Sequence, residues 1–136
     1  MIKGIGTDIV EVKRIKSAVE NSKEKFLSKV FTDSELAYSF KKNSPYMHLA
    51  ARFAAKEAVF KAFGCSIKGA NWKNIEIRND KNGKPSVILN GTFGKLMLKR
   101  NIRQVIVSLS HTGNYATATA ILIGKQNLQN ENSQRI

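Results

Sequence analysis

The chain has 136 residues and carries 23 lysine and arginine residues against 10 acidic ones, a formal net charge of +13. This length suits one domain of ordinary size, or two small lobes that share a core. No apolar run reaches the roughly 18 residues of a membrane span, and the first residues lack the basic-then-apolar pattern of a signal peptide. Cys65 is the one cysteine, which excludes an internal disulfide and zinc sites built on cysteine pairs. We expect a cytoplasmic protein whose charge favours an acidic partner: nucleic acid, anionic lipid or an acidic protein.

The first half of the chain predicts one strand followed by three helices. Thr32 and Glu35 have the spacing of a capping box, which marks the start of the second helix, and Pro45 is expected to end it. Gly64 provides a C-terminal stop for the third and longest helix. The predicted elements are a strand over 2–10, a helix over 11–22, a turn over 23–31, a helix over 32–43 and a helix over 46–63.

The second half alternates like strands, with one helical stretch. Asn82 and Gly83 supply the positive-φ geometry of a tight hairpin turn between its first two strands. Residues 125–136 lack periodicity and are rich in Asn and Gln, so we predict a disordered tail. The pattern is mixed α and β, and residues 1–124 are interpreted as a single α+β domain. The predicted elements are strands over 74–80 and 86–90, a helix over 91–101, and strands over 104–111 and 115–124.

The longest helix contains the stretch RFAAKEAVFKAFG, which places four charges among core-like residues: Arg52, Lys56, Glu57 and Lys61. Glu57 and Lys61 are one turn apart, so they form either a surface ion pair or part of a site. Arg52 and Lys61 are nine residues apart, which places them half a turn from each other. They serve one compact site only if a ligand wraps the helix or two subunits meet there. We interpret this helix as core on one side and active site on the other.

Asp8 is an acid near the end of a strand of small and apolar residues, where it needs a partner. It either caps the following helix or faces Glu57 from a neighbouring strand. Two carboxylates suit Mg²⁺, and a lysine one turn away suits a phosphate oxygen, which together indicate phosphoryl transfer. His111, at the end of the strand over 104–111, is either a surface histidine or a ligand contact.

Four segments in this order resemble the holo-acyl-carrier-protein synthase family, the short phosphopantetheinyl transferases: GIGTDIVEVKRI, ARFAAKEAVFKAFG, DKNGKP and SLSHTGNYA. The resemblance spans residues 3 to 123. It implies a phosphopantetheinyl transferase-like fold, with a small antiparallel sheet packed around a long central helix. It also implies a homotrimer with each active site between two subunits. The implied reaction moves the 4′-phosphopantetheine group of coenzyme A onto a serine of apo acyl carrier protein. It releases adenosine 3′,5′-bisphosphate and supports fatty acid biosynthesis.

The resemblance also implies residue roles. Asp8 and Glu57 would hold Mg²⁺, and with Lys61 at the phosphate they form the catalytic set. The serine proton would pass either to Glu57, through a water, or to His111, and the sequence leaves this choice open. Lys13 and Arg14 would dock the acidic carrier protein. Contacts with coenzyme A are implied for Arg52, Lys61, Gly64, Gly83, Lys84, Pro85, His111 and Thr112.

The sequence departs from the family pattern at Cys65 and Ser66, where a threonine-glycine pair is expected, so both are left out of the predicted site. Two other classes of protein were weighed. A nucleic-acid-binding protein would explain the charge, but the basic residues are scattered and no nucleic-acid motif is present. A non-catalytic binder of coenzyme A or carrier protein would not need Asp8, Glu57 and Lys61 together.

Overall fold

The structure, a computed structural model, describes residues 1–64 and 71–126; Cys65, Ser66 and residues 127–136 of the predicted tail lie outside the described residues. Three long strands form an antiparallel sheet in the order β1-β5-β4, and β2 and β3 form a separate antiparallel pair. The strands are β1 (Ile2–Glu11), β2 (Ile75–Asn79), β3 (Pro85–Leu89), β4 (Ile102–His111) and β5 (Tyr115–Gly124).

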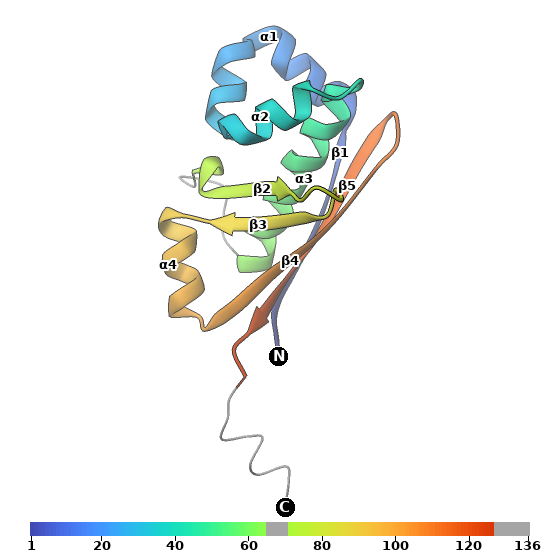
Figure 1. The fold of residues 1–136 in the computed structure, drawn as a ribbon. Helices are drawn as coiled ribbons and strands as arrows, with labels where there is room; N and C mark the ends of the chain where they lie inside the picture. The colour runs from blue at the N-terminus through green and yellow to red at the C-terminus, as the bar shows by residue number, and fades with distance from the viewer. Residues whose placement is uncertain (65–70, 127–136) are drawn as a thin grey trace, which may run out of the picture.

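The helices pack around these two sheets. They are α1 (Val12–Val30), α2 (Asp33–Phe40), α3 (Pro45–Phe63), the 3-10 turn η1 (Trp72–Asn74) and α4 (Gly91–Lys99). Helix α3 lies between the three-stranded sheet and the β2–β3 pair, with α1 and α2 near its start and α4 near its end (Figure 1). The structure therefore confirms the expected α+β fold, a small antiparallel sheet packed around a long central helix. None of the helices within residues 1–64 and 71–126 is long and apolar enough to cross a membrane.

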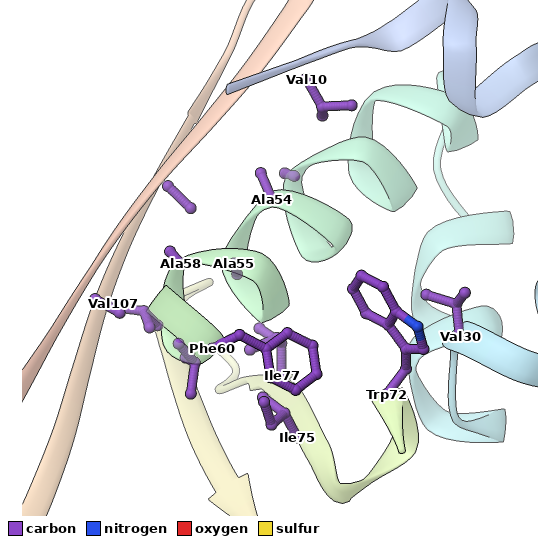
Figure 2. Close-up of a cluster of buried hydrophobic side chains, with 14 of the residues drawn as sticks. Val10, Val30, Ala54, Ala55, Ala58, Phe60, Trp72, Ile75, Ile77 and Val107 are labelled. Atoms are coloured by element: carbon purple, nitrogen blue, oxygen red, sulfur yellow. The ribbon is translucent and has the colours of Figure 1, made fainter. Parts of the chain in front are cut away.

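Helix α3 is buried along most of its length, and small residues on its sheet side let the strands approach it closely. Gly6 of β1 lies so close that an added Cβ would come within 2.0 Å of the Ala58 carbonyl oxygen. In Figure 2, Ala58 lies toward the long strands, whereas Trp72 and Ile75 lie on the opposite side of the helix. Alanines of β5, among them Ala118, complete the close contact on the sheet side. This close packing of β1 on α3 brings the two sequence motifs together.

Two predicted boundaries were wrong. Residues 23–31 are not a turn, because α1 continues to Val30 and only Ser22 leaves helical dihedral angles (φ −150°, ψ 50°). Leu27 and Val30 are buried in the core, and this burial keeps the polar segment helical. Pro45 does not end the second helix, which stops at Phe40. It is the first residue of α3, where a backbone N–H would have no partner within the helix, so proline loses no hydrogen bond there.

The predicted start of α2 and the predicted end of α3 were correct. Thr32 and Glu35 form both hydrogen bonds of a capping box, and Gly64 ends α3 in the left-handed conformation (φ 70°). In the β2–β3 turn Gly83 has a positive φ of 85°, but Asn82 does not, contrary to the prediction. The Asp80 carboxylate instead shapes this turn by accepting from the backbone N–H groups of Asn82 and Lys84.

Candidate active site

Asp8 faces α3 from the inner side of β1, where it meets Lys61. The Lys61 Nζ donates to Asp8 Oδ1 and to the Thr7 carbonyl oxygen, both at 3.0 Å. The alternative role of Asp8 as a helix cap is not observed, because Glu11 is the N-cap of α1 and makes no side-chain cap bond. The ion pair of Lys61 is thus with Asp8, from a distant strand, and not with Glu57 on its own helix.

Glu57 lies against Asp8. Burial raises the pKa of Glu57, and the negative charge of Asp8 and a hydrogen bond between the two carboxyl groups raise it further, while Lys61 and Arg14 act in the opposite direction. Two adjoining carboxylates repel each other unless a proton or a cation lies between them. Mg²⁺ is commonly held by one or two carboxylates together with substrate phosphates, so this pair fits that ion. No cluster of three or more metal-ligating side chains occurs within residues 1–64 and 71–126.

A cavity of about 410 Å³ opens beside these carboxylates, between α1, β1 and α3. We call it the carboxylate cavity. Its charged groups are Asp8, Glu57 and Arg14. Its remaining walls are apolar or aromatic: Ile9, Val10, Ile15, Ala18, Phe26 and Phe53.

A second cavity, of about 280 Å³, surrounds Arg52 and is called the arginine cavity. Arg52 is only 2% exposed, and its guanidinium lies 4.1 Å from the centre of the Tyr38 ring. Its Nη1 donates to the His48 carbonyl oxygen at 3.2 Å and its Nη2 to Asn79 Oδ1, whereas Nε finds no acceptor among the described groups. Burial lowers the pKa of Arg52 from its usual value. The lining residues are Tyr38, His48, Ala51, Arg52, Asn79, Gly83, Pro85, Val107, Ser108, Leu109 and His111.

The predicted site residues therefore divide between two cavities of one chain. Asp8, Glu57 and Arg14 line the carboxylate cavity, and Arg52, His111, Gly83 and Pro85 line the arginine cavity. Arg52 and Glu57 are five positions apart, which corresponds to a rotation of about 140° around α3, so the two cavities lie on different faces of this helix.

The other predicted residues line neither of these two cavities. Gly64 is the cap of α3, and the side chain of Lys84 lines a separate hollow with Asp80. The Thr112 hydroxyl accepts from the backbone N–H groups of Asn114 and Tyr115, which shapes the β4–β5 turn. Lys13 is exposed, and its Nζ pairs with Glu11 Oε2 at 3.5 Å. It precedes Arg14 in the sequence but does not line the carboxylate cavity.

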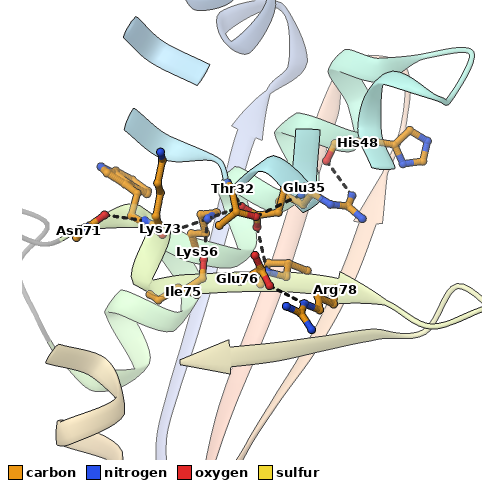
Figure 3. Close-up of polar contacts among 12 residues, drawn as sticks. Thr32, Glu35, His48, Lys56, Asn71, Lys73, Ile75, Glu76 and Arg78 are labelled. Atoms are coloured by element: carbon orange, nitrogen blue, oxygen red, sulfur yellow. Dashed lines mark hydrogen bonds and ion pairs between the residues drawn. The ribbon is translucent and has the colours of Figure 1, made fainter. Parts of the chain in front are cut away.

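Lys56, the charge of this stretch for which no site role was predicted, lies on the core side of α3. Its ammonium pairs with Glu35 at 2.8 Å, and both side chains are fully buried. It also donates to the carbonyl oxygens of Trp72 and Ile75, while Glu35 accepts from the backbone N–H of Ile77 (Figure 3). Lys56 therefore joins α3 to α2 and β2 within the core.

Sequence reasoning missed three side chains of the arginine cavity that contact Arg52 or His111: Tyr38, His48 and Asn79. His48 carried a usable signal, because it precedes Arg52 by four residues and so shares its helix face. Tyr38 and Asn79 come from α2 and β2, and no local pattern connects them to Arg52.

The sequence of this chain is similar to those of known proteins. The profile of the 4′-phosphopantetheinyl transferase superfamily matches residues 4–120. A holo-[acyl-carrier-protein] synthase of Thermodesulfovibrio yellowstonii is 48% identical over 122 residues, 90% of this chain and 99% of the relative. The corresponding enzyme of Caldanaerobacter subterraneus is 42% identical over 123 residues, 90% of this chain and 96% of the relative.

Solved structures of similar sequence share the fold of this chain. The holo-[acyl-carrier-protein] synthase of Neisseria meningitidis matches with a TM-score of 0.82 and 36% identity, covering 90% of this chain and 98% of that one. That of Bacillus anthracis, solved in complex with CoA (3′,5′-ADP), matches with a TM-score of 0.75 and 34% identity, covering 92% and 99%. The resemblance seen in the sequence is confirmed: this chain belongs to the holo-[acyl-carrier-protein] synthase family of the 4′-phosphopantetheinyl transferase superfamily.

Proposed function

We propose that this protein transfers the 4′-phosphopantetheine group of coenzyme A to a serine of apo acyl carrier protein, giving the holo form and adenosine 3′,5′-bisphosphate. The observation that carries this proposal is the contact of Asp8, Glu57 and Lys61, which unites two carboxylates and a cation from distant motifs. Holo-[acyl-carrier-protein] synthases of other organisms align with 90% of this chain, and that of Helicobacter pylori was solved in complex with coenzyme A.

Asp8 and Glu57 would hold Mg²⁺, which when bound neutralises the diphosphate and aligns it for in-line displacement. Lys61 is suited to a phosphate oxygen because its side chain is 53% exposed, so it can turn from Asp8 toward a ligand. There it offsets the charge that grows on the leaving phosphate. Glu57, whose pKa is raised, is our choice for taking the serine proton through a water, because it lies beside Asp8, where the diphosphate is proposed to bind.

The nucleotide end of coenzyme A is proposed to occupy the arginine cavity. Arg52 and His111 supply positive charge there, and the Gly83–Pro85 turn forms one wall. The two cavities of one chain lie on different faces of α3, so we propose a homotrimer in which each substrate bridges the carboxylate cavity of one subunit and the arginine cavity of the next. The outer face of the three-stranded sheet supports assembly, because it exposes Ile5, Ile9, Ile106 and Tyr115.

Arg14 is proposed to dock the acidic carrier protein, because it lies in the wall of the carboxylate cavity and Lys13 is exposed beside it. Replacing Arg14 by glutamine should raise KM for the carrier and leave KM for coenzyme A unchanged. Lys25→Gln, at an exposed position of the same helix, is the charge-matched control. An equal rise in both KM values for Arg14→Gln would argue against docking.

The activity itself is tested by incubating the protein with coenzyme A, Mg²⁺ and apo acyl carrier protein, followed by intact mass spectrometry of the carrier. We expect the carrier to gain one phosphopantetheine, and we expect EDTA or Asp8→Ala to prevent the gain. Coenzyme A that binds but is never transferred to any of several apo carriers would leave a binding protein and refute the proposed function.

A further inference from the structure

One end of the molecule carries positive charge without acidic residues beside it. In Figure 1 the N-terminus, α4 and the last residues of β5 lie together at this end, whereas α1 lies at the opposite end. The residues that meet here come from two segments, 1–7 and 81–126, and neither segment contains an aspartate or a glutamate. We call this surface the basic end. Its exposed charged side chains are Lys3, Lys95, Lys99, Arg103 and Lys125.

Contacts between distant segments bring these bases to one place. The Lys125 backbone N–H donates to the Asn101 carbonyl oxygen at 2.8 Å, which joins the end of β5 to the turn after α4. The Lys3 side chain lies against Gly124, where an added Cβ would come within 2.7 Å of Lys3 Cε. Arg103 follows two residues after Asn101, at the start of β4. The start of β1, the end of β5 and the α4–β4 turn therefore form one continuous surface.

Helix α4 turns one face to the core and the opposite face to solvent. Phe93 is buried and packs on Phe63 at the end of α3, with ring centroids 5.4 Å apart. Lys95 and Lys99 are both exposed and four positions apart, so they share the outward face. Leu98 adjoins them and is 71% exposed, an unusual position for a large aliphatic side chain.

The bases of the basic end are not used elsewhere in the fold. Within residues 1–64 and 71–126, none of them forms an ion pair. Arg100 is left out of the set because its Nη1 donates to the Phe63 carbonyl oxygen at 2.6 Å. None of the five bases lines the carboxylate cavity or the arginine cavity. Positive charge that is neither paired nor part of the proposed reaction favours a separate anionic partner.

The basic residues of α1 form a different kind of surface, because acids lie among them. Lys13 pairs with Glu11, and Glu20 and Glu24 alternate with the lysines of the second half of the helix. Charges of both signs that are interspersed in this way are typical of an ordinary solvated surface. The positive field is therefore least cancelled at the basic end.

Two exposed aliphatic side chains indicate which anionic partner fits. Leu98 and Ile2, which is 65% exposed, both lie among these bases. A nucleic acid neutralises lysines through its phosphates but offers an aliphatic side chain no apolar medium to enter. The surface of an anionic bilayer attracts lysine and arginine to its headgroups and accepts aliphatic side chains at the boundary with the acyl chains.

We propose that the basic end is an interaction surface for an anionic phospholipid bilayer. Lys95 and Lys99 contact the headgroups, Leu98 enters the boundary with the acyl chains, and the other three bases extend the contact around the end of the sheet. The contact is peripheral and does not depend on the proposed function. Because α1 lies at the opposite end of the molecule, Arg14 stays open to the carrier protein while the basic end is bound.

The test is flotation of the intact protein with vesicles of phosphatidylcholine, alone or mixed with phosphatidylglycerol, at low and at high salt. We expect binding to the mixed vesicles only, and stronger binding at low salt, because ions screen exposed charges. Lys95→Gln combined with Lys99→Gln should lower the affinity at low salt by about 25-fold, about fivefold for each base. Leu98→Ser should lower it by about tenfold, a factor that depends little on salt because the burial of an aliphatic side chain is not screened.

Lys23→Gln combined with Lys25→Gln is the matched control, because it removes the same charge from exposed positions of α1 and should change vesicle binding little. The Lys95/Lys99 and Leu98 variants should keep the Tm and the transfer activity of the wild type, since these side chains are exposed and outside both cavities.

Three outcomes would overturn the inference: no binding to the mixed vesicles at low salt, equal losses in the two double variants, or tighter binding to a nucleic-acid duplex than to the mixed vesicles. A protein that binds the mixed vesicles as expected but modifies no carrier would refute the proposed function and leave this inference standing. A protein that modifies the carrier but does not bind the vesicles would do the reverse.

Discussion

Lys61 Nζ lies 3.0 Å from Asp8 Oδ1, although 53 positions separate the two residues in the sequence. The contact exists because β1 lies directly on α3, where Gly6 leaves no side chain between the two backbones. It joins the N-terminal motif to the helix motif, and Glu57 completes the cluster.

The two lysines of α3 should have opposite roles. Lys56→Met leaves Glu35 as a fully buried carboxylate without its cation, so we expect a loss of about 3–5 kcal/mol in the free energy of unfolding. Lys61→Met breaks a half-exposed pair and should cost less than about 1 kcal/mol. The same variant should nevertheless greatly reduce phosphopantetheine transfer. Urea unfolding and the transfer assay on both variants test this, and equal stability losses would contradict it.

Gly6 should be required for both stability and activity. A methyl group there would lie within 2.0 Å of the Ala58 carbonyl oxygen, so in Gly6→Ala strand β1 must move away from α3 and carry Asp8 with it. We expect a loss of about 1–3 kcal/mol in unfolding free energy, typical of an overpacked core, together with weaker stabilisation by Mg²⁺. Gly113→Ala is the control, because nothing lies within 4 Å of its added Cβ. A fully active Gly6→Ala would show that the close approach is not needed.

Removing one negative charge from the carboxylate pair should stabilise the protein in the absence of metal. In Glu57→Gln the repulsion from Asp8 disappears, so the Tm measured in EDTA should rise, while transfer and the Tm increase caused by Mg²⁺ should be lost. Glu20→Gln, at an exposed position of α1, removes the same charge without this effect. Scanning calorimetry with and without Mg²⁺ measures both quantities. A Mg²⁺-dependent rise in Tm that survives in Glu57→Gln would exclude Glu57 as a ligand.

His48 should make the stability of the ligand-free protein depend on pH. Its folded-state pKa lies below the 6.5 of the unfolded chain, so between these two values the unfolded chain binds more protons. His48 therefore destabilises the folded protein only below pH 6.5, and the free energy of unfolding decreases as the pH falls through this window. His48→Phe should reduce the slope of Tm against pH in the range of about 5 to 7. A variant with the same slope as the wild type would contradict the assignment.

The sequence alone determined most of the local structure, because the signals that define it act over a few residues. The Thr32–Glu35 capping box, the Gly64 stop and the turn at Gly83 depend on backbone geometry and short-range hydrogen bonds. The contact of Asp8 with Glu57 was also predictable as one of two alternatives, because an acid in an apolar strand needs a partner. The helical course of residues 23–30 was not, because it depends on burial of Leu27 and Val30 against other elements.

Only the tertiary structure decided which charges are core and which belong to a cavity. Lys56 and Lys61 are both lysines of one motif, yet Lys56 lies in the core beside Glu35 and Lys61 reaches Asp8 at the surface. The two lysines lie on different faces of α3, and the elements packed on each face determine whether the lysine there is buried. The arginine cavity likewise combines Tyr38, His48, Asn79 and His111 from four separate elements. The sequence identifies the residues that carry charge. The packing of β1 and the β2–β3 pair against α3 determines which of these charges are buried in the core and which lie at a cavity.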